Sequence, residues 1–179
     1  RSDELFIPLL KCRLDSGFYD EAERAVMEYD LQKASSNRIG HQANDFLFYT
    51  LRGGKSSLYK IGSEYIIIFI NNPGCPMCMD IIKALKEDEY INILIENHRL
   101  KVLAIYPDED LTEFRKHLSD MDSRWINAYD KGCQIDAGNL YNLDAIPSLY
   151  LLDASKRVLI KDSTSVDELS FVLRRMDDM

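Results

Sequence analysis

The sequence predicts an α/β fold, a three-layer α/β/α sandwich with a central mixed sheet. The first observation is an apolar, β-branched run at 65–70, which is typical of a buried strand. This run ends at a turn, Asn-Asn-Pro-Gly, followed at once by Cys75 and Cys78 in the spacing C-x-x-C and then by a helical pattern. Strand and helix patterns also alternate through the rest of the chain, which favours a sheet with helices on both faces.

The first part of the chain predicts a helical N-terminal extension over residues 1–40, and the α/β domain then occupies 41–179. Two apolar stripes with helical spacing are separated by a turn at 15–17, so the simplest prediction is a helical hairpin. One stripe begins at Leu5 and the other at Phe18. A hairpin of this size is too small to be stable alone and needs packing partners.

The remaining elements follow from local patterns, in which strands rich in β-branched and aromatic residues alternate with helical periods. We expect strands at 45–50, 57–61, 65–70, 101–106, 125–129, 148–152 and 157–161. We expect helices at 76–89, 90–97, 111–118 and 138–143. A last helix begins after Ser165, because Ser-x-x-Glu with Glu168 has the pattern of a capping box.

The composition is that of a globular chain with an acidic balance. Its 179 residues are enough for one domain with a sizeable core. The 22 basic and 30 acidic residues give a net charge of −8, which disfavours binding to nucleic acid or to an anionic membrane. No apolar run approaches the roughly 20 residues that a membrane span needs. The chain opens with Arg1 rather than Met, so we expect a processed or a trimmed chain, and an upstream signal or lipid anchor stays open.

The C-x-x-C pair predicts a reactive dithiol. The turn before it places Cys75 at a helix N-terminus, where unpaired backbone N–H groups and the helix dipole favour a thiolate over a thiol. Pro76 suits the first helical position, because its missing N–H costs nothing there. The alternative is half of a zinc site, but structural zinc needs a second ligand pair, and no other Cys or His has that spacing. The remaining cysteines, Cys12 and Cys133, are expected to be small core residues.

A second motif, Ile-Pro-Ser-Leu-Tyr at 146–150, precedes the last predicted hairpin and helix. On base rates alone Pro147 is a strand-entry proline with a trans bond. With the strand and C-x-x-C helix before it, however, the motif resembles the thioredoxin superfamily, in which this proline is cis and lies against the dithiol. The strand pair within 46–61 resembles extracytoplasmic thioredoxin-like proteins of the TlpA/ResA type, and the helical extension resembles Bacteroidetes members of that group.

The resemblance implies a thiol–disulfide oxidoreductase of the bacterial cell envelope or periplasm, with no cofactor or metal beyond the redox-active pair. Cys75 would be the nucleophile and Cys78 the buried resolving thiol. Its partners would be protein thiols or disulfides and an upstream redox protein. An extended substrate segment would pair with the peptide groups of Ile146. The implied substrate-binding residues are Gly74, Pro76, Met77, Ile146 and Pro147.

Some positions depart from the resemblance. Gly74 stands where many relatives have Trp, and Phe69 where the thioredoxins proper have a buried Asp. The proton acceptor for Cys78 is therefore unassigned, since Asp80, the nearest carboxylate in sequence, is expected to face solvent. Two other classes stay open: a non-catalytic binding or scaffold domain and a peroxide-reducing relative. The latter ranks last, because 72–74 supplies neither the Thr nor the Arg that such a site would want.

Overall fold

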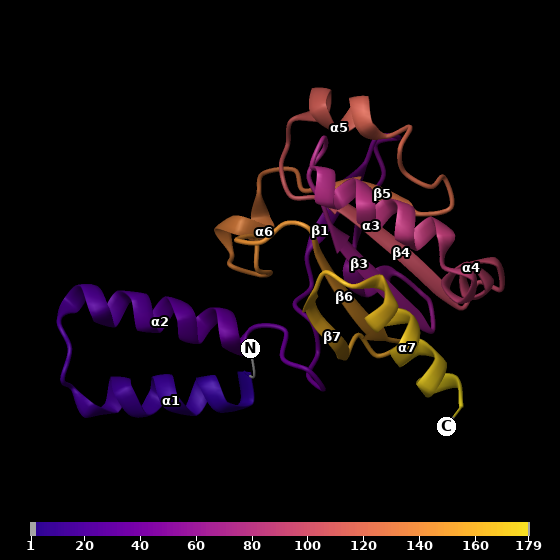
Figure 1. Cartoon of the computed structure of the whole chain (residues 1–179). Helices are drawn as coiled ribbons and strands as arrows, with labels where there is room; N and C mark the ends of the chain where they lie inside the picture. The colour runs from indigo at the N-terminus through magenta and orange to yellow at the C-terminus, as the bar shows by residue number, and fades with distance from the viewer. Residues whose placement is uncertain (1–2, 179) are drawn as a thin grey trace.

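The structure, a computed structural model, describes residues 3–178 and has a seven-stranded mixed sheet at its centre (Figure 1). The strand order is β2-β1-β5-β4-β3-β6-β7. β3 pairs in parallel with β4 and antiparallel with β6, and β4 pairs in parallel with β5. The strands are β1 Leu47–Thr50, β2 Lys55–Ser57, β3 Tyr65–Ile70, β4 Leu100–Tyr106, β5 Ile126–Tyr129, β6 Ser148–Asp153 and β7 Val158–Ser163.

Both faces of the sheet are covered, which buries all six residues of β3. On one face Phe69 joins a core with α3, α4 and α7, and on the other Ile68 joins a core with residues from 43–61 and 135–141. This confirms the predicted thioredoxin-like α/β fold. The helices are α1 Asp3–Ser16, α2 Glu21–Ser35, α3 Pro76–Glu87, α4 Glu89–Glu96, α5 Leu111–His117, α6 Gln134–Ala137 and α7 Val166–Asp177.

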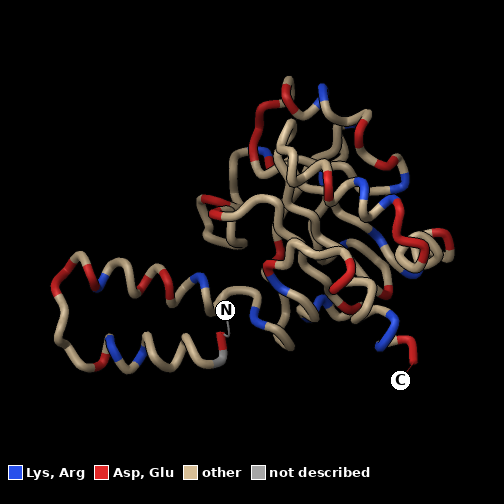
Figure 2. Tube along the Cα trace, viewed as in Figure 1, with Lys and Arg blue, Asp and Glu red and all other residues tan. Residues whose placement is uncertain are grey.

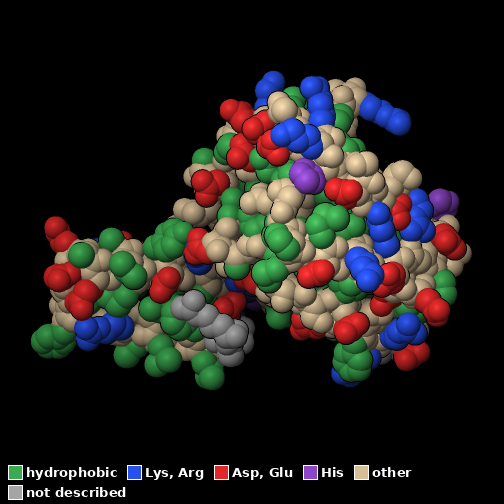
Figure 3. All heavy atoms as spheres, turned by 45° about the horizontal axis from the view of Figure 1, so that its top comes forward, with side chains coloured by type: hydrophobic (Ala, Val, Ile, Leu, Met, Phe, Trp, Pro, Cys, Tyr) green, Lys and Arg blue, Asp and Glu red, His purple; other side chains and the backbone are tan. Residues whose placement is uncertain are grey.

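Helices α1 and α2 form the expected hairpin, which projects from the body of the molecule (Figure 1). Helix α2 begins later than the apolar stripe suggested. The Asp20 side chain accepts the N–H of Glu23, and the Glu23 side chain accepts the N–H of Asp20. Phe18 therefore lies before the helix and is 80% exposed. Leu5 and Leu9 are also exposed, and Figure 3 shows hydrophobic side chains along the projecting hairpin.

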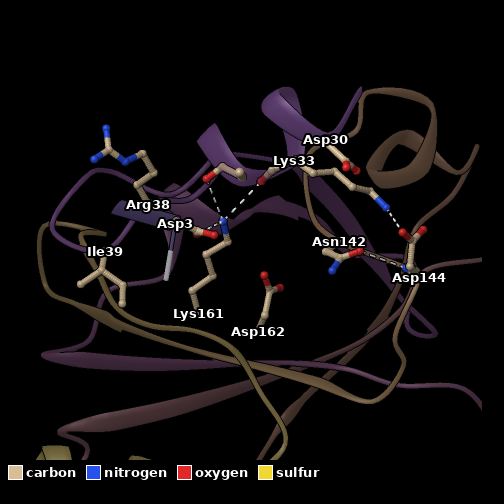
Figure 4. Close-up of a pocket in the computed structure, with 10 residues that line it drawn as sticks. Asp3, Asp30, Lys33, Arg38, Ile39, Asn142, Asp144, Lys161 and Asp162 are labelled. Atoms are coloured by element: carbon tan, nitrogen blue, oxygen red, sulfur yellow. Dashed lines mark hydrogen bonds and ion pairs between the residues drawn. The ribbon is translucent and has the colours of Figure 1, made fainter. Parts of the chain in front are cut away.

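A polar cavity of about 450 Å³ lies between the hairpin and β7 (Figure 4). Lys161 extends from β7 to the end of α2, and its Nζ lies 3.3 Å from the carbonyl oxygen of Lys33 and 3.2 Å from that of Ala34. The same ammonium group donates to Asp3 Oδ2 at 2.9 Å. Because the last carbonyls of a helix carry partial negative charge, a lysine suits this position. These contacts hold the hairpin against the sheet.

The predicted helix at 138–143 is wrong, because the helix in this region is α6 at Gln134–Ala137. The Asp130 carboxylate accepts the N–H of Ile135 at 2.7 Å, which fixes the beginning of the helix. The chain then leaves the helix at Gly138. The pattern beyond that glycine forms no helix.

The predicted strand at 57–61 is also displaced. Strand β2 ends at Ser57, and a 3₁₀ turn, η1, follows at Leu58–Lys60. The N–H of Tyr59 donates to the Asp45 side chain at 3.0 Å and so is not available to a neighbouring strand. The strand pair β1–β2 is nevertheless present, in antiparallel register.

Charged side chains of both signs are interspersed along the chain (Figure 2). One cluster joins distant segments. Arg99 donates two hydrogen bonds to Glu64, at 2.6 and 2.7 Å, and two to Asp177, at 2.7 and 2.9 Å. Hydrogen bonding to the guanidinium holds the pKa of both carboxyls below the ordinary value. No helix within residues 3–178 is long and apolar enough to cross a membrane.

Candidate functional site

The dithiol lies at the turn between the end of β3 and the beginning of α3. Between them the chain turns through Gly74, whose φ of +71° lies in the left-handed region that glycine adopts at little cost. Cys75 caps α3, and its Sγ accepts a hydrogen bond from the backbone N–H of Cys78 at 3.3 Å. Pro76 is the first helical residue. The sulfur of Cys75 therefore faces the unpaired N–H groups of the helix, which favour negative charge.

The two thiols have different surroundings. Cys75 is half-buried, whereas Cys78 is buried with 1% of its surface exposed, and both are free thiols. Burial first, and then the hydrogen bond with Cys75, raise the pKa of Cys78 to about 12. A hydrogen bond with the backbone of Asn72 acts in the opposite direction. One sulfur is thus accessible to a partner and the other is held protonated beneath it.

Among residues 3–178, the surroundings of Cys78 are apolar rather than acidic. Phe69 is fully buried and belongs to the same apolar core cluster as Cys78. Asp80 is exposed on α3, as the sequence predicts. Within residues 3–178 no carboxylate is hydrogen-bonded to the Cys78 thiol.

The distant proline motif lies beside the end of the strand that leads to the dithiol. The peptide bond between Ile146 and Pro147 is cis, which agrees with the expectation from the resemblance. Ser148 pairs with Ile70 in the antiparallel register of β6 and β3, so Pro147 lies beside the end of β3 from which the dithiol loop departs. Within the described part of the chain, the backbone N–H and C=O of Ile146 have no hydrogen-bond partner. They are available to pair with an extended segment.

A groove of about 380 Å³ leads away from this point. One wall is α3, from Met77 to Ala84, and the other is the connection from β7 into α7 at 164–167. Pro147 lines the groove together with Met77, the residue between the cysteines. Of the predicted substrate-binding residues, the structure brings these two together in one groove.

His117, at the end of α5, is a neighbour of the site that the sequence analysis missed. Its Nε2 lies 3.6 Å from the position that a Cβ on Gly74 would occupy, and its Nδ1 lies 3.3 Å from Asp120 Oδ2. No local pattern marks this histidine, because its place beside the dithiol depends on how α5 packs near α3.

The other two cysteines are not the core residues expected. Cys12 is exposed on α1. Cys133 is only half-buried and precedes α6 with a φ of +49°. Among the residues that the structure describes, no three His, Cys, Asp or Glu side chains gather as a metal site requires.

Comparison with known proteins bears on this site. The model of a family described as thioredoxin-like matches residues 62–158. A thioredoxin-like protein from Bacteroides caccae is 40% identical, with a TM-score of 0.93 over 98% of this chain, which spans 63% of that protein's length. The C-terminal domain of an uncharacterized Bacteroides fragilis protein is 45% identical, with a TM-score of 0.75 over 77% of this chain and 98% of that domain.

A more distant structure shares the fold. The thioredoxin domain of a thiol-disulfide oxidoreductase from Bacteroides vulgatus is 18% identical, with a TM-score of 0.68 over 79% of this chain and 99% of that domain. No functionally curated protein matches the chain. The family match covers more than half of the sequence and includes the dithiol and the cis-proline. The chain therefore belongs to the thioredoxin-like family.

Proposed function

We propose that the protein is a thiol–disulfide oxidoreductase that acts on protein disulfides or dithiols. The observation that carries this proposal is the arrangement of an accessible Cys75 at a helix N-terminus, a buried Cys78 one turn further on and a cis Pro147 in the same region. The names of structurally similar proteins, among them the Bacteroides vulgatus thiol-disulfide oxidoreductase, agree with it.

The reaction proceeds in two exchanges. The Cys75 thiolate attacks one sulfur of the partner's disulfide, the partner's S–S bond breaks, and its second sulfur leaves as a thiolate. A mixed disulfide now joins Cys75 to the partner. Cys78 then loses its proton and attacks the sulfur of Cys75, which releases the partner as a thiol and forms the Cys75–Cys78 disulfide. Two electrons pass from the dithiol to the partner, and the reverse sequence oxidises a partner dithiol.

The substrate backbone pairs with Ile146 in this proposal. An extended segment adds to the free peptide groups before the cis-proline, as a strand adds to the edge of a sheet. Gly74, Pro76 and Met77 form the surface around Cys75, and Pro147 closes it from the other side. This pairing holds the substrate disulfide in line with the Cys75 sulfur.

The finer assignment is a TlpA/ResA-like protein of the cell envelope, served by an upstream redox partner. The support is the strand pair β1–β2 and the helical hairpin, the features on which that resemblance rests. Fractionation of cells that express the full-length protein tests the location. Recovery of the protein with the cytoplasmic fraction alone would contradict it.

The activity is tested by the redox equilibrium of Cys75 and Cys78 against glutathione and by turnover of insulin disulfides. We expect the wild type to cycle and Cys75→Ser to be inactive. The matched control is a Cys12→Ser, Cys133→Ser double variant, which should keep full activity. If the dithiol does not cycle, the protein is a non-catalytic binding or scaffold domain instead. If Cys75→Ser turns over insulin like the wild type, Cys75 is not the nucleophile and the proposal fails.

A further inference from the structure

The groove beside the dithiol has a surface suited to one class of polypeptide. Its floor is apolar, since Ile81 and Val166 are buried beneath it and Met77, which is 58% exposed, borders it next to the cysteines. Such a floor accommodates an aliphatic or aromatic side chain at the cost of little polar desolvation. The groove begins beside the cysteines, at Met77 and Pro147, so a substrate segment next to the reacting cysteine is in position to enter it.

Two carboxylates flank this apolar floor. Asp80 belongs to α3 and Asp167 to the first turn of α7, so they come from opposite walls of the groove. Both side chains are exposed, and neither has an ion-pair or hydrogen-bond partner within residues 3–178. No Lys or Arg of the described chain lines the groove. The negative charge of the groove is therefore not neutralised internally.

Within residues 3–178 neither carboxylate caps a helix or joins a hydrogen-bond network, and Asp167 interacts with the fold only through the dipole of α7. The neighbouring Glu168, by contrast, accepts a hydrogen bond from Ser163 Oγ at 2.6 Å, and Ser165 caps α7. Asp80 does not cap α3, because Cys75 does. Replacing Asp80 and Asp167 by Asn should therefore keep the fold, at the cost of a small loss of helix stability from Asp167, and should remove the negative charge of the groove.

We propose that this groove selects cationic polypeptide substrates, in which an apolar residue and a Lys or Arg lie within a few residues of the disulfide cysteine. The inference rests on the proposed oxidoreductase function and deepens it. The apolar side chain occupies the floor over Ile81 and Val166. The basic side chain lies between Asp80 and Asp167, while the segment's backbone pairs with Ile146. The charge complementarity is local to the groove and adds to the overall charge of −8.

The test uses three peptides that differ at one position. Each carries a cysteine in a mixed disulfide with thionitrobenzoate, an adjacent Leu, and then Lys, Gln or Glu. We measure the second-order rate constant with which Cys75 of the reduced protein attacks the mixed disulfide of each peptide. The protein carries the Cys12→Ser and Cys133→Ser substitutions, and the measurement is made at low and at high salt. We expect the Lys peptide to react roughly tenfold faster than the Glu peptide at low salt, because each exposed ion pair contributes roughly fivefold at most. High salt should reduce this ratio.

Matched variants locate the effect. Asp80→Asn combined with Asp167→Asn should bring the Lys/Glu ratio close to one. Asp136→Asn, an exposed carboxylate on α6 that does not line the groove, should leave the ratio unchanged. A wild-type ratio near one would overturn the proposal. So would a ratio that the groove variants leave intact, or one that Asp136→Asn lowers equally, since the net charge alone would then account for it.

A small neutral probe separates this proposal from the proposed function. Reaction of the wild-type protein with hydroxyethyl disulfide requires Cys75 but no contact with the groove, so it reports the thiol exchange on its own. If the wild type reduces this probe but shows no peptide preference, only the substrate class is wrong. If it reduces neither the probe nor any peptide, the oxidoreductase function itself fails.

Discussion

Because the resolving thiol Cys78 is buried, we expect closure of the active-site disulfide, the attack of Cys78 on the mixed disulfide at Cys75, to depend strongly on pH. Burial is the larger cause of the raised pKa of Cys78, about 12, and the hydrogen bond with Cys75 is the second. At pH 7 a thiol with that pKa is deprotonated in about one molecule in 10⁵. The thiolate is the attacking species, so the rate of attack by Cys78 follows this fraction.

When the pH is raised from 6 to 9, we expect the rate of closure to rise roughly a thousandfold. Formation of the mixed disulfide at Cys75 removes the hydrogen bond between the two thiols, but burial of Cys78 remains. The rise should therefore stay close to tenfold per pH unit over the whole range.

The assay is the reaction of the reduced protein with dithionitrobenzoate in the Cys12→Ser, Cys133→Ser background. The first equivalent of thionitrobenzoate reports attack by Cys75, and the second reports closure by Cys78. Cys78→Ser, which lacks the second phase, is the control. A second phase that is independent of pH, or that levels off below pH 8, would contradict this prediction, because Cys78 would then have a proton acceptor in the mixed disulfide.

Three further predictions concern stability. Gly74→Ala should lower the free energy of unfolding in urea by about 1–2 kcal/mol, because an alanine is strained at this positive φ. The new Cβ adds no clash, since the nearest atom to it lies 3.6 Å away. A loss above about 4 kcal/mol would contradict this prediction. The lowered carboxyl pKa values of Glu64 and Asp177 stabilise the fold above about pH 4, and this stability is lost as pH falls further. Arg99→Gln should therefore flatten the dependence of thermal stability on pH between 5 and 3. An unchanged dependence would show that the ion pairs of Arg99 with these two carboxylates do not contribute to it. Lys161→Met should lower the free energy of unfolding by about 2 kcal/mol and make the segment between α2 and β1 sensitive to protease, because the contacts of Lys161 with the hairpin are lost. Equal resistance of wild type and variant to protease would show that these contacts do not hold the hairpin.

The sequence determined the elements whose causes are local. The buried strand β3, the turn, and the helix that begins after Cys75 follow from an apolar run, turn chemistry and helical period. The start of α7 was predicted in the same way, and Ser165 does accept the N–H of Glu168 at 3.2 Å. Where a local signal competed with a longer pattern the prediction was wrong, as at 138–143, where a glycine ends the helix that the Asp130 side chain had already fixed.

The resemblance already implied a cis-proline beside the dithiol, and the sheet register places Pro147 beside the end of β3. Only the tertiary structure shows the other neighbours of the dithiol, since the packing of α5 brings His117 against Gly74. The groove with its unpaired carboxylates is formed by α3 and α7, which are far apart in the chain. The exposure of Cys12 likewise depends on what α1 packs against. Periodicity and capping act within a few residues, so the sequence shows them directly, whereas these contacts arise only when the sheet brings distant segments together.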